Sequence, residues 1–411
     1  MKKLVRITTV PVSLDKLLGN QLDFMNRHYD VTAVSSDRAA LSKVAEKYGI
    51  NHHHIEMTRQ ITPLKDLKSL WKVYRFLKKH KPEIVHTHTP KAGLIGMSAA
   101  FFAGVPIRMH TVAGLPLMEA SGIKRQVLKM AERTTYSFAN GVYPNSFNMA
   151  KIISSYGFCK DTKMKVLGNG SSNGIDLDHF SPSFITSIQK SAHRASLGIS
   201  EDDFVFVFVG RLVKDKGINE LVKAFTSLSQ HHPKMSVKLL LVGDYEEKLD
   251  PLHPETIKEI NHHPHIINVG FQDDVRPYFA ISNALAFPSY REGFPNVVLQ
   301  AAAMELPCIV TDINGCNEII TDHHNGLFVP LKNSQKLEDA MLRLYENREL
   351  YHSLKINTRQ SIEERFIQNY LWLEMQKEYN HQLSNRQKKE NYKEKTYRTR
   401  IFEKAFSFFS L

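Results

Sequence analysis

The chain has 411 residues, 42% of them hydrophobic, and a formal net charge of +12 from 54 basic and 42 acidic residues. This length exceeds what one compact core usually holds, so we expect two domains in a folded globular protein. No apolar stretch approaches the about 20 residues of a membrane-spanning helix, and Met1–Ile7 lacks the apolar segment of a signal peptide. Three cysteines give neither a disulfide framework nor a metal-binding spacing, so we expect reduced thiols in a cytoplasmic protein.

Apolar, β-rich segments alternate with helical patterns along the whole chain. The predicted strands of the first half are Leu4–Val10, Val31–Ser35, Ile84–His88, Ile107–Val112, Gly141–Pro144 and Lys165–Leu167. Those of the second half are Phe204–Val209, Lys238–Val242, Ile266–Val269, Ala284–Phe287, Cys308–Thr311 and Leu327–Val329. Nearly continuous apolar strands between helices are typical of parallel sheets covered on both faces. The pattern therefore predicts an α/β protein of two doubly wound, Rossmann-like domains, with the ligand at the carboxyl ends of the strands.

The alternation is interrupted once, at the polar, proline-containing segment 181–191, where we place the linker. From Gln335 to about Leu383 the pattern predicts one long helical run, whose end packs back on the first domain. The expected organisation is a first domain at 1–182, a second at 195–365, a returning helix at 366–383 and a basic amphipathic tail at 384–411.

Basic residues concentrate in two segments of the chain. Leu64–Lys79 contains six Lys or Arg and one Asp, and the tail from Ser384 contains eight Lys or Arg and three Glu. Such clusters favour anionic partners such as phosphates, anionic lipid or nucleic acid, although a solubilising surface has the same composition. No nucleic-acid-binding motif accompanies them, so nucleic acid is not expected as a partner.

Glycine and two cations follow the first strand of the second domain. That strand ends at Gly210, and Arg211 and Lys216 come directly after it. Glycine lets the backbone approach a ligand closely, and the two cations are suited to grip a diphosphate. The alternative interpretation is a surface turn with two solvated charges.

Three further strand ends carry similar signals. Two strands are followed by Gly243 and by Gly270 with Phe271, and a third leads into the turn Ser289–Gln300. This turn places the carboxylate of Glu292 directly before the helix predicted from Asn296. A carboxylate can bind sugar hydroxyls and a helix N-terminus can bind phosphate. The coincidence of four strand ends predicts a nucleotide-diphosphate site.

Three segments resemble one enzyme family. They are Val209–Gly217, Pro288–Leu299 and Asn173–Phe180, and the similarity covers about residues 1–380. On these motifs the chain resembles the retaining glycosyltransferases of the glycogen-synthase-like family 4, which have the two-domain GT-B fold. The resemblance implies transfer of a sugar from a nucleotide sugar with retention at the anomeric carbon, without a metal or another cofactor.

The resemblance also implies a role for each matching residue in binding the donor. Arg211 and Lys216 would bind the diphosphate and Glu292 the sugar hydroxyls, while the base would lie near Gly270 and Phe271. Sugar and phosphate would contact the backbone of Gly293, Phe294, Pro295, Asn296 and Val297. The family usually has a second glutamate where this chain has Gln300; glutamine keeps a carbonyl acceptor for a ribose hydroxyl but loses the negative charge.

In the first domain, Leu18-Gly19-Asn20 resembles the loop that approaches the donor phosphates and the acceptor, and is expected to begin a helix after the first strand. His110, at the end of a strand, is expected to touch the donor sugar or the reacting centre; the alternative is a histidine bonded to backbone. His88 and Lys91 are expected near an acceptor phosphate.

Other clusters of histidines and acids are weaker candidates for a functional site. His86 and His88 point to the same face, but a metal site would need a third ligand, which is not evident. His52–His54 is expected as a surface loop. Asp176-Leu-Asp178 matches the metal-binding Asp-x-Asp pattern of another glycosyltransferase class, yet lies in a segment typical of this metal-independent family.

The expected function is that of a glycosyltransferase in surface polysaccharide or glycan assembly, with a UDP-sugar as donor and a lipid-linked acceptor. Alternatives are a UDP-N-acetylglucosamine 2-epimerase, which shares the architecture, and a non-catalytic sugar-nucleotide binder. Leu64, Leu67, Trp71, Tyr74 and Leu77 form one face of a helix that either faces the core or lies near anionic lipid. Together with the tail and the basic segment 123–133, this face predicts peripheral association with the inner surface of the cell membrane.

Overall fold

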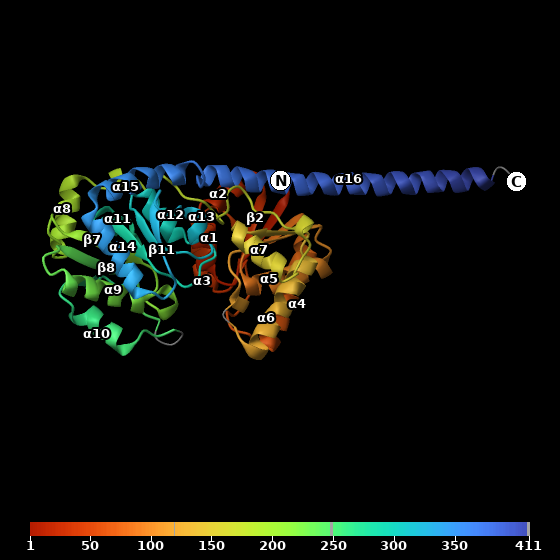
Figure 1. Ribbon diagram of the computed structural model, residues 1–411. Helices are drawn as coiled ribbons and strands as arrows, with labels where there is room; N and C mark the ends of the chain where they lie inside the picture. The colour runs from red at the N-terminus through yellow and green to blue at the C-terminus, as the bar shows by residue number, and fades with distance from the viewer. Residues whose placement is uncertain (119, 247–249, 409–411) are drawn as a thin grey trace. The chain divides into compact units, whose positions relative to one another are not determined.

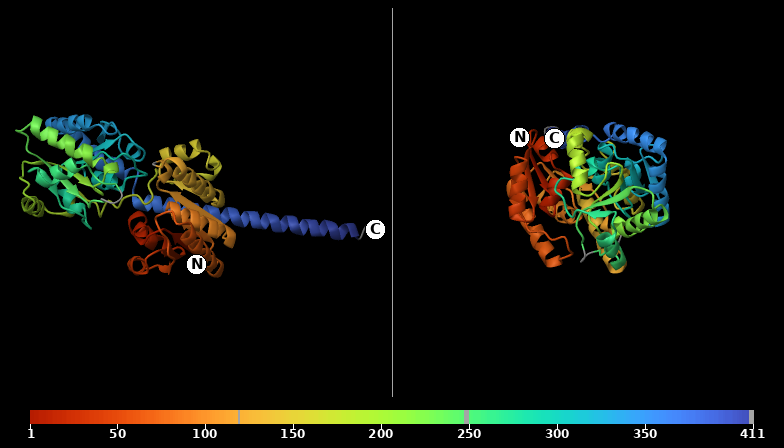
Figure 2. Two further views of the ribbon diagram at one scale, coloured as in Figure 1. Left: turned by 90° about the horizontal axis from the view of Figure 1, so that it is seen from below. Right: turned by 90° about the vertical axis from the view of Figure 1, so that its left-hand side faces the viewer.

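The computed structural model describes residues 1–118, 120–246 and 250–408, with side chains as far as residue 388 (Figure 1). The chain forms two compact units. Unit 1 comprises Met1–Pro144, Ile153–Leu167 and Tyr370–Leu411, and unit 2 comprises Asn145–Ile152 and Gly168–Asn369. Each contains one six-stranded sheet with helices on both faces (Figure 2), which confirms the predicted α/β architecture of two doubly wound domains.

All strand pairs in the sheet of unit 1 are parallel. Its strands are β1 (Lys3–Ile7), β2 (Asp30–Ser35), β3 (Asn51–His54), β4 (Ile84–Thr87), β5 (Ile107–Val112) and β6 (Gly141–Pro144), in the order β3-β2-β1-β4-β5-β6. Ile7, the last residue of β1, lies opposite Val34 of β2 and Thr87 of β4. The strand order reverses between β1 and β4, and ligands of open α/β sheets bind at the carboxyl ends beside such a reversal.

Two layers of helices cover this sheet. The helices are α1 (Pro11–Leu17), α2 (Gln21–Asn26), α3 (Arg38–Lys47), α4 (Pro63–His80), α5 (Pro90–Ala103) and α6 (Gly122–Phe138). A further helix, α7 (Phe147–Ser155), is divided, with residues 147–152 in unit 2 and residues 153–155 in unit 1. α4 packs against α5, and α5 packs against α6. α1, α2 and α3 share their apolar core with Leu371, Met375, Tyr379 and Leu383 of α16 (Gln368–Phe408). The returning end of the chain therefore contributes to the core of unit 1.

The sheet of unit 2 has the same design. Its strands are β7 (Phe204–Val209), β8 (Val237–Val242), β9 (Ile266–Asn268), β10 (Ala284–Phe287), β11 (Cys308–Thr311) and β12 (Gly326–Val329), in the order β12-β11-β10-β7-β8-β9. All strand pairs are parallel, and Val209 at the end of β7 lies opposite Val242 at the end of β8. The order reverses between β7 and β10.

The helices of unit 2 are α8 (Ser187–Ser196), α9 (Ile218–His231), α10 (Pro254–His262), α11 (Arg276–Ala280), α12 (Asn296–Ala303), α13 (Cys316–Ile319), α14 (Ser334–Glu346) and α15 (Arg348–Glu363). α9 packs against α10 and α14, and α12 packs against α15. Short 3₁₀ turns occur in both units. In unit 1 they are η1 (Pro116–Met118) and η2 (Asp161–Lys163), and in unit 2 they are η3 (Pro182–Phe184) and η4 (Lys214–Lys216). The buried strands are nearly all Val, Leu, Ile, Ala and Phe, as expected for strands covered on both faces.

Three local predictions about strands and helices were wrong. Lys165–Leu167 is not a strand, although the amide of Lys165 donates to Val142. His52–His54 is not a loop but part of β3, an exposed edge strand whose polar side chains conceal its pairing with β2. The long helical run is divided into α14, α15 and α16. Asn347 separates the first two, since its side chain caps α15 by accepting from the amide of Leu350.

The segment from Gly168 to residue 182 belongs to unit 2, not to the first domain as predicted. Ile175 forms a parallel bridge with Ile367, and its amide donates to the carbonyl of Phe366 at 2.8 Å. These backbone bonds attach the segment to the chain between α15 and α16, well before the polar linker at 181–191.

Candidate active site

Three glycines bring the ends of β7, β8 and β9 close together. The amide of Gly243 donates to the carbonyl of Gly270 at 2.8 Å, and a Cβ atom added at Gly243 would lie 1.9 Å from the carbonyl oxygen of Gly210. Gly210, Gly243 and Gly270 all have positive φ angles, of 149°, 151° and 65°. At Gly243, only glycine accommodates both this conformation and this close approach. The strand ends predicted to form one site therefore do lie side by side.

Lys216 and Glu292 meet where the strand order reverses. Lys216 follows β7, Glu292 follows β10, and the ammonium of one contacts the carboxylate of the other. Both side chains are more than four-fifths buried. Glu292 also accepts a hydrogen bond from the hydroxyl of Ser289 at 2.9 Å. This arrangement places a fixed carboxylate and a fixed cation within one small volume.

Arg211 lies at the same edge but is more exposed. Half of its side-chain surface is accessible, and its guanidinium contacts the carboxylate of Glu246. Phe271 is also exposed, at 60%, and its amide donates to Asp244 at 3.1 Å. The predicted diphosphate and base contacts are thus accessible groups that follow β7 and β9.

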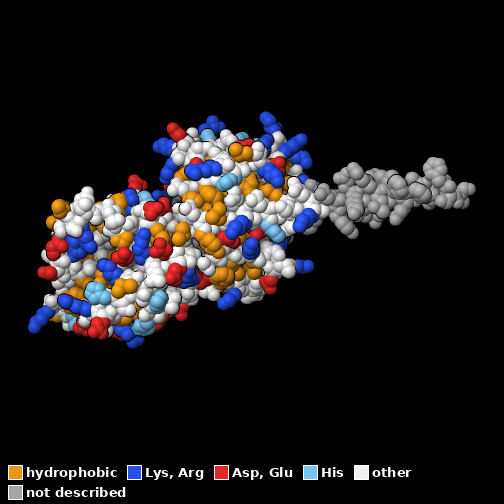
Figure 3. All heavy atoms as spheres, turned by 90° about the horizontal axis from the view of Figure 1, so that it is seen from above, with side chains coloured by type: hydrophobic (Ala, Val, Ile, Leu, Met, Phe, Trp, Pro, Cys, Tyr) orange, Lys and Arg blue, Asp and Glu red, His pale blue; other side chains and the backbone are white. Residues whose placement is uncertain are grey.

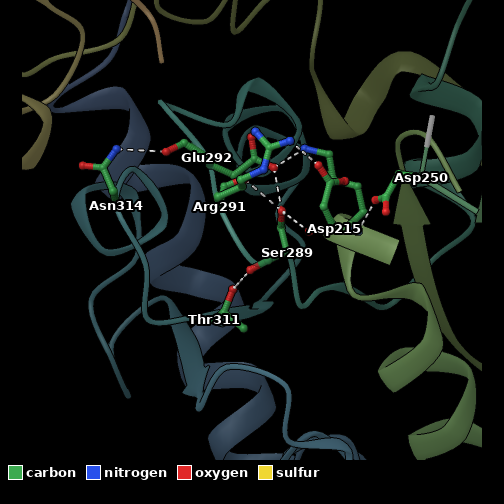
Figure 4. Close-up of polar contacts among 8 residues, drawn as sticks. Asp215, Asp250, Ser289, Arg291, Glu292, Thr311 and Asn314 are labelled. Carbon is green, nitrogen blue, oxygen red and sulfur yellow. Dashed lines mark hydrogen bonds and ion pairs between the residues drawn. The ribbon is translucent and has the colours of Figure 1, made fainter. Parts of the chain in front are cut away.

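The segment 289–293, here called the donor loop, is held by polar contacts on both sides (Figure 4). The amide of Tyr290 donates to the carbonyl of Asp215 at 2.8 Å, and the guanidinium of Arg291 pairs with the Asp215 carboxylate. The amide of Asp215 in turn donates to Asp250 at 2.7 Å. On the other side, the hydroxyl of Thr311 donates to the carbonyl of Ser289. The loop is therefore tied both to the turn after β7 and to the end of β11.

Asn314 makes further contacts with this loop. Its side-chain amide donates to the carbonyl of Glu292 at 2.9 Å and to that of Gly293 at 3.0 Å. Neither Asn314 nor Asp215 was predicted from the sequence. The one available signal for Asn314 was the Asn-Gly pair shortly after an apolar strand, which marks a turn but not its partner.

α12 presents a polar edge next to the donor loop. Asn296, Val297 and Gln300 are partly exposed, whereas Val298, Leu299 and Ala301–Ala303 are buried. Among the described residues, no side chain caps the start of α12, so the N–H groups of Asn296 and Val297 are available to a ligand. Pro295 has no N–H, and its carbonyl accepts from Val298, so the predicted backbone contact of Pro295 cannot be a donated hydrogen bond. Phe294 is 8% exposed and its ring lies 5.3 Å from that of Phe366.

In unit 1, buried polar groups occupy the carboxyl ends of β1, β4 and β5. The Arg6 guanidinium donates to Nε2 of His88 at 2.8 Å and to Gln21 at 2.7 Å. His86 lies between the hydroxyls of Tyr379 and Thr111, and its ring centroid is 4.1 Å from that of His88. Burial holds the pKa values of both histidines well below the ordinary value, with Arg6 adding to the effect. These two histidines are therefore neutral hydrogen-bonding groups.

His110 lies within β5, two residues before its end, and not at the strand end. Nδ1 of His110 bonds to the Thr87 hydroxyl at 2.7 Å. The side chain is 2% exposed, and burial lowers its pKa to about 3. A Cβ atom at Gly93 would lie 2.5 Å from the imidazole, so glycine at this position makes room for His110.

Within the described part of the chain, the other predicted residues of unit 1 make no hydrogen bond to Arg6, His86, His88 or His110. The ammonium of Lys91 contacts the Asp66 carboxylate and donates to the carbonyl of Gln60 at 2.7 Å, which ties α5 to α4. Gly19 and Asn20 do not follow β1 directly, since α1 intervenes; they join α1 to α2, with φ of 49° at Gly19 and an exposed Asn20. Among the described residues, no group of three His, Cys, Asp or Glu is arranged to hold a metal ion.

Comparisons with known proteins identify the family of this chain. Residues 22–170 match the family described as glycosyl transferase 4-like domain, and residues 189–361 match glycosyl transferases group 1. The capsular polysaccharide biosynthesis glycosyltransferase CapM of Staphylococcus aureus is 32% identical over 380 residues, which cover 92% of this chain and 97% of CapM.

Two further proteins are more distant. The Escherichia coli UDP-Gal:alpha-D-GlcNAc-diphosphoundecaprenol alpha-1,3-galactosyltransferase is 27% identical over 330 residues, covering 79% of this chain and 82% of that enzyme. The crystal structure of Anabaena HepE with UDP and glucose superposes with a TM-score of 0.77 at 20% identity, covering 92% of this chain and all of HepE. The family matches and the relation to CapM, taken with the two doubly wound sheets, show that the chain belongs to the family 4 glycosyltransferases of GT-B fold.

Proposed function

We propose that this glycosyltransferase moves a sugar from a UDP-sugar to a lipid-linked or oligosaccharide acceptor during assembly of a bacterial surface polysaccharide, with retention of configuration. The contact between Lys216 and Glu292 carries the proposal, because it places a cation for the diphosphate beside a carboxylate for sugar hydroxyls. UDP as the nucleotide is supported by HepE, which was crystallised with UDP, and a lipid-linked acceptor by the name of the Escherichia coli relative.

The proposed reaction is a substitution on one face of the sugar. The bond from the anomeric carbon to the diphosphate oxygen breaks while the acceptor hydroxyl oxygen bonds to the same carbon from the same side. The acceptor proton passes to the departing phosphate oxygen. Lys216 and Arg211 offset the negative charge that grows on the diphosphate, and Glu292 orients the sugar. Orientation and electrostatic stabilisation therefore lower the activation free energy of the transfer.

Neither a metal ion nor another cofactor is required in this proposal. The two cations and the first amides of α12 provide the positive potential that the leaving diphosphate needs. Addition of a chelator is therefore expected to leave turnover unchanged.

We also propose that the enzyme acts while bound peripherally to the cytoplasmic face of the membrane. No helix in the described part of the chain is long and apolar enough to cross a bilayer. On α4, however, Leu64, Leu67 and Trp71 are 86%, 65% and 53% exposed, so much of the predicted apolar face does not face the core. On α6, Ile123 and Met130 are 85% and 65% exposed. Lysine and arginine side chains flank these positions, as on helices that lie in anionic membrane interfaces.

Overall charge supports this localisation less than the exposed apolar residues do. On the face shown in Figure 3, lysine and arginine side chains are interspersed with acidic and apolar ones. The predicted basic tail also falls mostly outside the residues whose side chains the structure describes. The proposal of membrane association therefore rests on α4 and α6.

A nucleotide-sugar panel tests the proposed function. A donor that binds only the folded protein raises the melting temperature, so UDP-sugars should stabilise the protein and matched GDP-sugars should not. Product analysis then separates three outcomes: transfer to an acceptor, epimerisation of the donor without transfer, and binding without reaction. Either of the last two outcomes overturns the proposal.

A further inference from the structure

The side chain of Asn314 has a single arrangement that satisfies all of its neighbours. Its Nδ2 group donates to the carbonyls of Glu292 and Gly293, and its Oδ1 atom accepts from the hydroxyl of Ser146 at 3.1 Å. The Ser146 oxygen already accepts from the amide of Met149 at 3.0 Å, so the hydroxyl proton is free to point at Asn314. A flipped Asn314 amide would oppose oxygen to the two carbonyls. The two carbonyls and the Ser146 hydroxyl therefore favour the same orientation of the Asn314 amide.

The orientation of two carbonyls also determines that of two N–H groups. A peptide unit is planar and trans, so its C=O and N–H point in opposite directions. When Asn314 holds the carbonyls of Glu292 and Gly293, the N–H groups of Gly293 and Phe294 must point away from Asn314. Among the described residues, neither N–H has a hydrogen-bond partner. Two aligned donors are thus left for a ligand beside the carboxylate of Glu292.

Gly315 permits this arrangement and makes it sensitive to change. A Cβ atom at Gly315 would lie 2.5 Å from the carbonyl oxygen of Gly293, and the φ angle of Gly315 is 81°. The residue next to Asn314 therefore allows the backbone of the donor loop to approach closely.

Ser146 belongs to the connection between the two units. It follows β6 by two residues, is fully buried, and lies in the segment 145–152, which is part of unit 2. Glu318 fixes the same segment by accepting from the amides of Phe147 and Asn148 at 2.6 and 2.9 Å. The donor loop is therefore hydrogen-bonded, through one side chain, to the first residues that follow the sheet of unit 1 in the chain.

We propose that Asn314 is the positioning residue of the donor site: held by Ser146, it aims the N–H groups of Gly293 and Phe294 at anionic or hydroxyl oxygens of the nucleotide sugar. The inference rests on the proposed function for the identity of the ligand. Asn314 itself does not contact the donor; it acts through the backbone of the loop.

The test compares four variants at a temperature at which all are folded. Asn314→Asp keeps the shape and the acceptor for Ser146 but removes both donated bonds, and Ser146→Ala removes the bond that orients the amide. Ser146→Thr retains the hydroxyl. Asn317→Ala is the matched control, because Asn317 lies three residues after Asn314. Its side chain bonds to Asp312 and Asn148 but, among the described residues, not to the donor loop.

The measurements are kcat, KM and the affinities for UDP and for the UDP-sugar that stabilises the wild type most, among UDP-glucose, UDP-galactose and UDP-N-acetylglucosamine. In Asn314→Asp the N–H groups of Gly293 and Phe294 are no longer aimed at the nucleotide sugar. Loss of these two hydrogen bonds to charged or polar oxygens should lower kcat/KM by about 10- to 100-fold or more. Ser146→Ala should lower kcat/KM about 5-fold, which corresponds to one hydrogen bond of about 1 kcal/mol. Ser146→Thr, which keeps the hydroxyl, should have a kcat/KM close to that of the wild type. Asn317→Ala should lower the melting temperature only.

Unchanged kcat/KM in Asn314→Asp, or an equal loss in Asn317→Ala, would overturn the assignment of Asn314 and leave the proposed function standing. A wild-type protein that binds neither UDP nor any UDP-sugar would overturn both.

Discussion

Lys216 and Glu292 are 76 residues apart in the chain, yet the ammonium of one contacts the carboxylate of the other. They meet because β7 and β10 are neighbours in a sheet whose order reverses between them. The strand that precedes Lys216, β7, is the first of the second series, and the strand that precedes Glu292, β10, is the fourth. A topological switch point thus assembles the two charges that the proposed reaction needs most.

Replacing Lys216 with Ala should lower kcat about 100- to 1,000-fold, the usual effect of removing one preorganised charge from a leaving group. The protein should remain folded, although Glu292 loses its partner. Lys223→Ala is a suitable control, because Lys223 is an exposed lysine on the neighbouring helix α9. Near wild-type turnover in Lys216→Ala would refute the role of this cation.

Replacing Gln300 with Glu should leave turnover similar or lower the KM of the donor slightly. Gln300 lies on the partly exposed edge of α12 next to the donor loop, where a carboxylate would strengthen a hydrogen bond to a ribose hydroxyl. Steady-state kinetics with varied donor concentration gives the result directly. Complete loss of activity in this variant would argue against a ribose contact at this position.

Gly315→Ala should damage the donor loop through both its backbone conformation and its contact with Gly293. Gly315 and Gly104 have nearly equal φ angles of 81° and 76°, but only Gly104 is in the left-handed helical region, since ψ is 24° there and −46° at Gly315. A Cβ atom meets the Gly293 carbonyl at 2.5 Å at Gly315 and open space at Gly104. Gly104→Ala should therefore lower the free energy of unfolding only by the strain of a left-handed alanine, about 1–2 kcal/mol, and should leave activity normal. Gly315→Ala should cost more and also lower kcat/KM at least about 10-fold. Equal stability and activity in the two variants would contradict the proposed close approach.

His110→Asn should make unit 1 less sensitive to acid. The folded pKa of His110 is lowered to about 3, whereas the unfolded value is about 6.5, so the unfolded state binds the extra proton between these values. Stability is therefore fully present above about pH 6.5 and falls as the pH decreases, by up to about 1.4 kcal/mol per pH unit for one histidine. Removing His110 should remove that part of the slope.

Tryptophan fluorescence suits this measurement, because both tryptophans, Trp71 and Trp372, belong to unit 1. Urea unfolding at several pH values between 5 and 6.5 compares wild type with His110→Asn. Parallel pH dependences would show that His110 is not held neutral in the folded state.

The exposed apolar residues of α4 and α6 should govern membrane binding. Wild-type protein should float with vesicles that contain phosphatidylglycerol, and the double variant Leu64→Ser/Ile123→Ser should float at least about 10-fold less, since each side chain contributes about 1–2 kcal/mol when buried. Ile188→Ser is the control, as Ile188 on α8 is similarly exposed at 83%. Flotation of a chain that ends at residue 383 shows how much the tail contributes to membrane binding.

Added salt should weaken this binding because part of it is electrostatic. Absence of binding by every form of the protein would refute the membrane proposal, and equal binding by the double variant would exclude α4 and α6 as its cause.

Much of the fold and of the donor site was predictable because apolar strands and their glycine-rich ends are local signals. Gly210, Gly243, Gly270 and Glu292 could be assigned to one edge, since parallel strands end on the same side of a sheet. β3 was missed because its residues, Asn51–His54, are polar and mostly exposed at the edge of the sheet. Edge strands lack the apolar pattern on which such predictions depend.

The roles of Asn314 and Ser146 were not predictable for a different reason. Each bonds to a residue distant in sequence, and the contact exists only after β6, β10 and β11 are in place. The neutral state of His110 likewise depends on burial beneath α5, which no local pattern shows. Such features follow from packing between elements and not from the elements themselves.

The most direct test of the account is the anomeric configuration of the product. The enzyme is incubated with the UDP-sugar that stabilises it most and a polyprenyl-diphosphate-linked sugar, and the new linkage is read by proton NMR, with Lys216→Ala in parallel. A retaining transferase gives a product with the same anomeric configuration as the donor, formed by the wild type and nearly absent with the variant. An inverted linkage, or donor epimerisation without transfer, would contradict the proposed function.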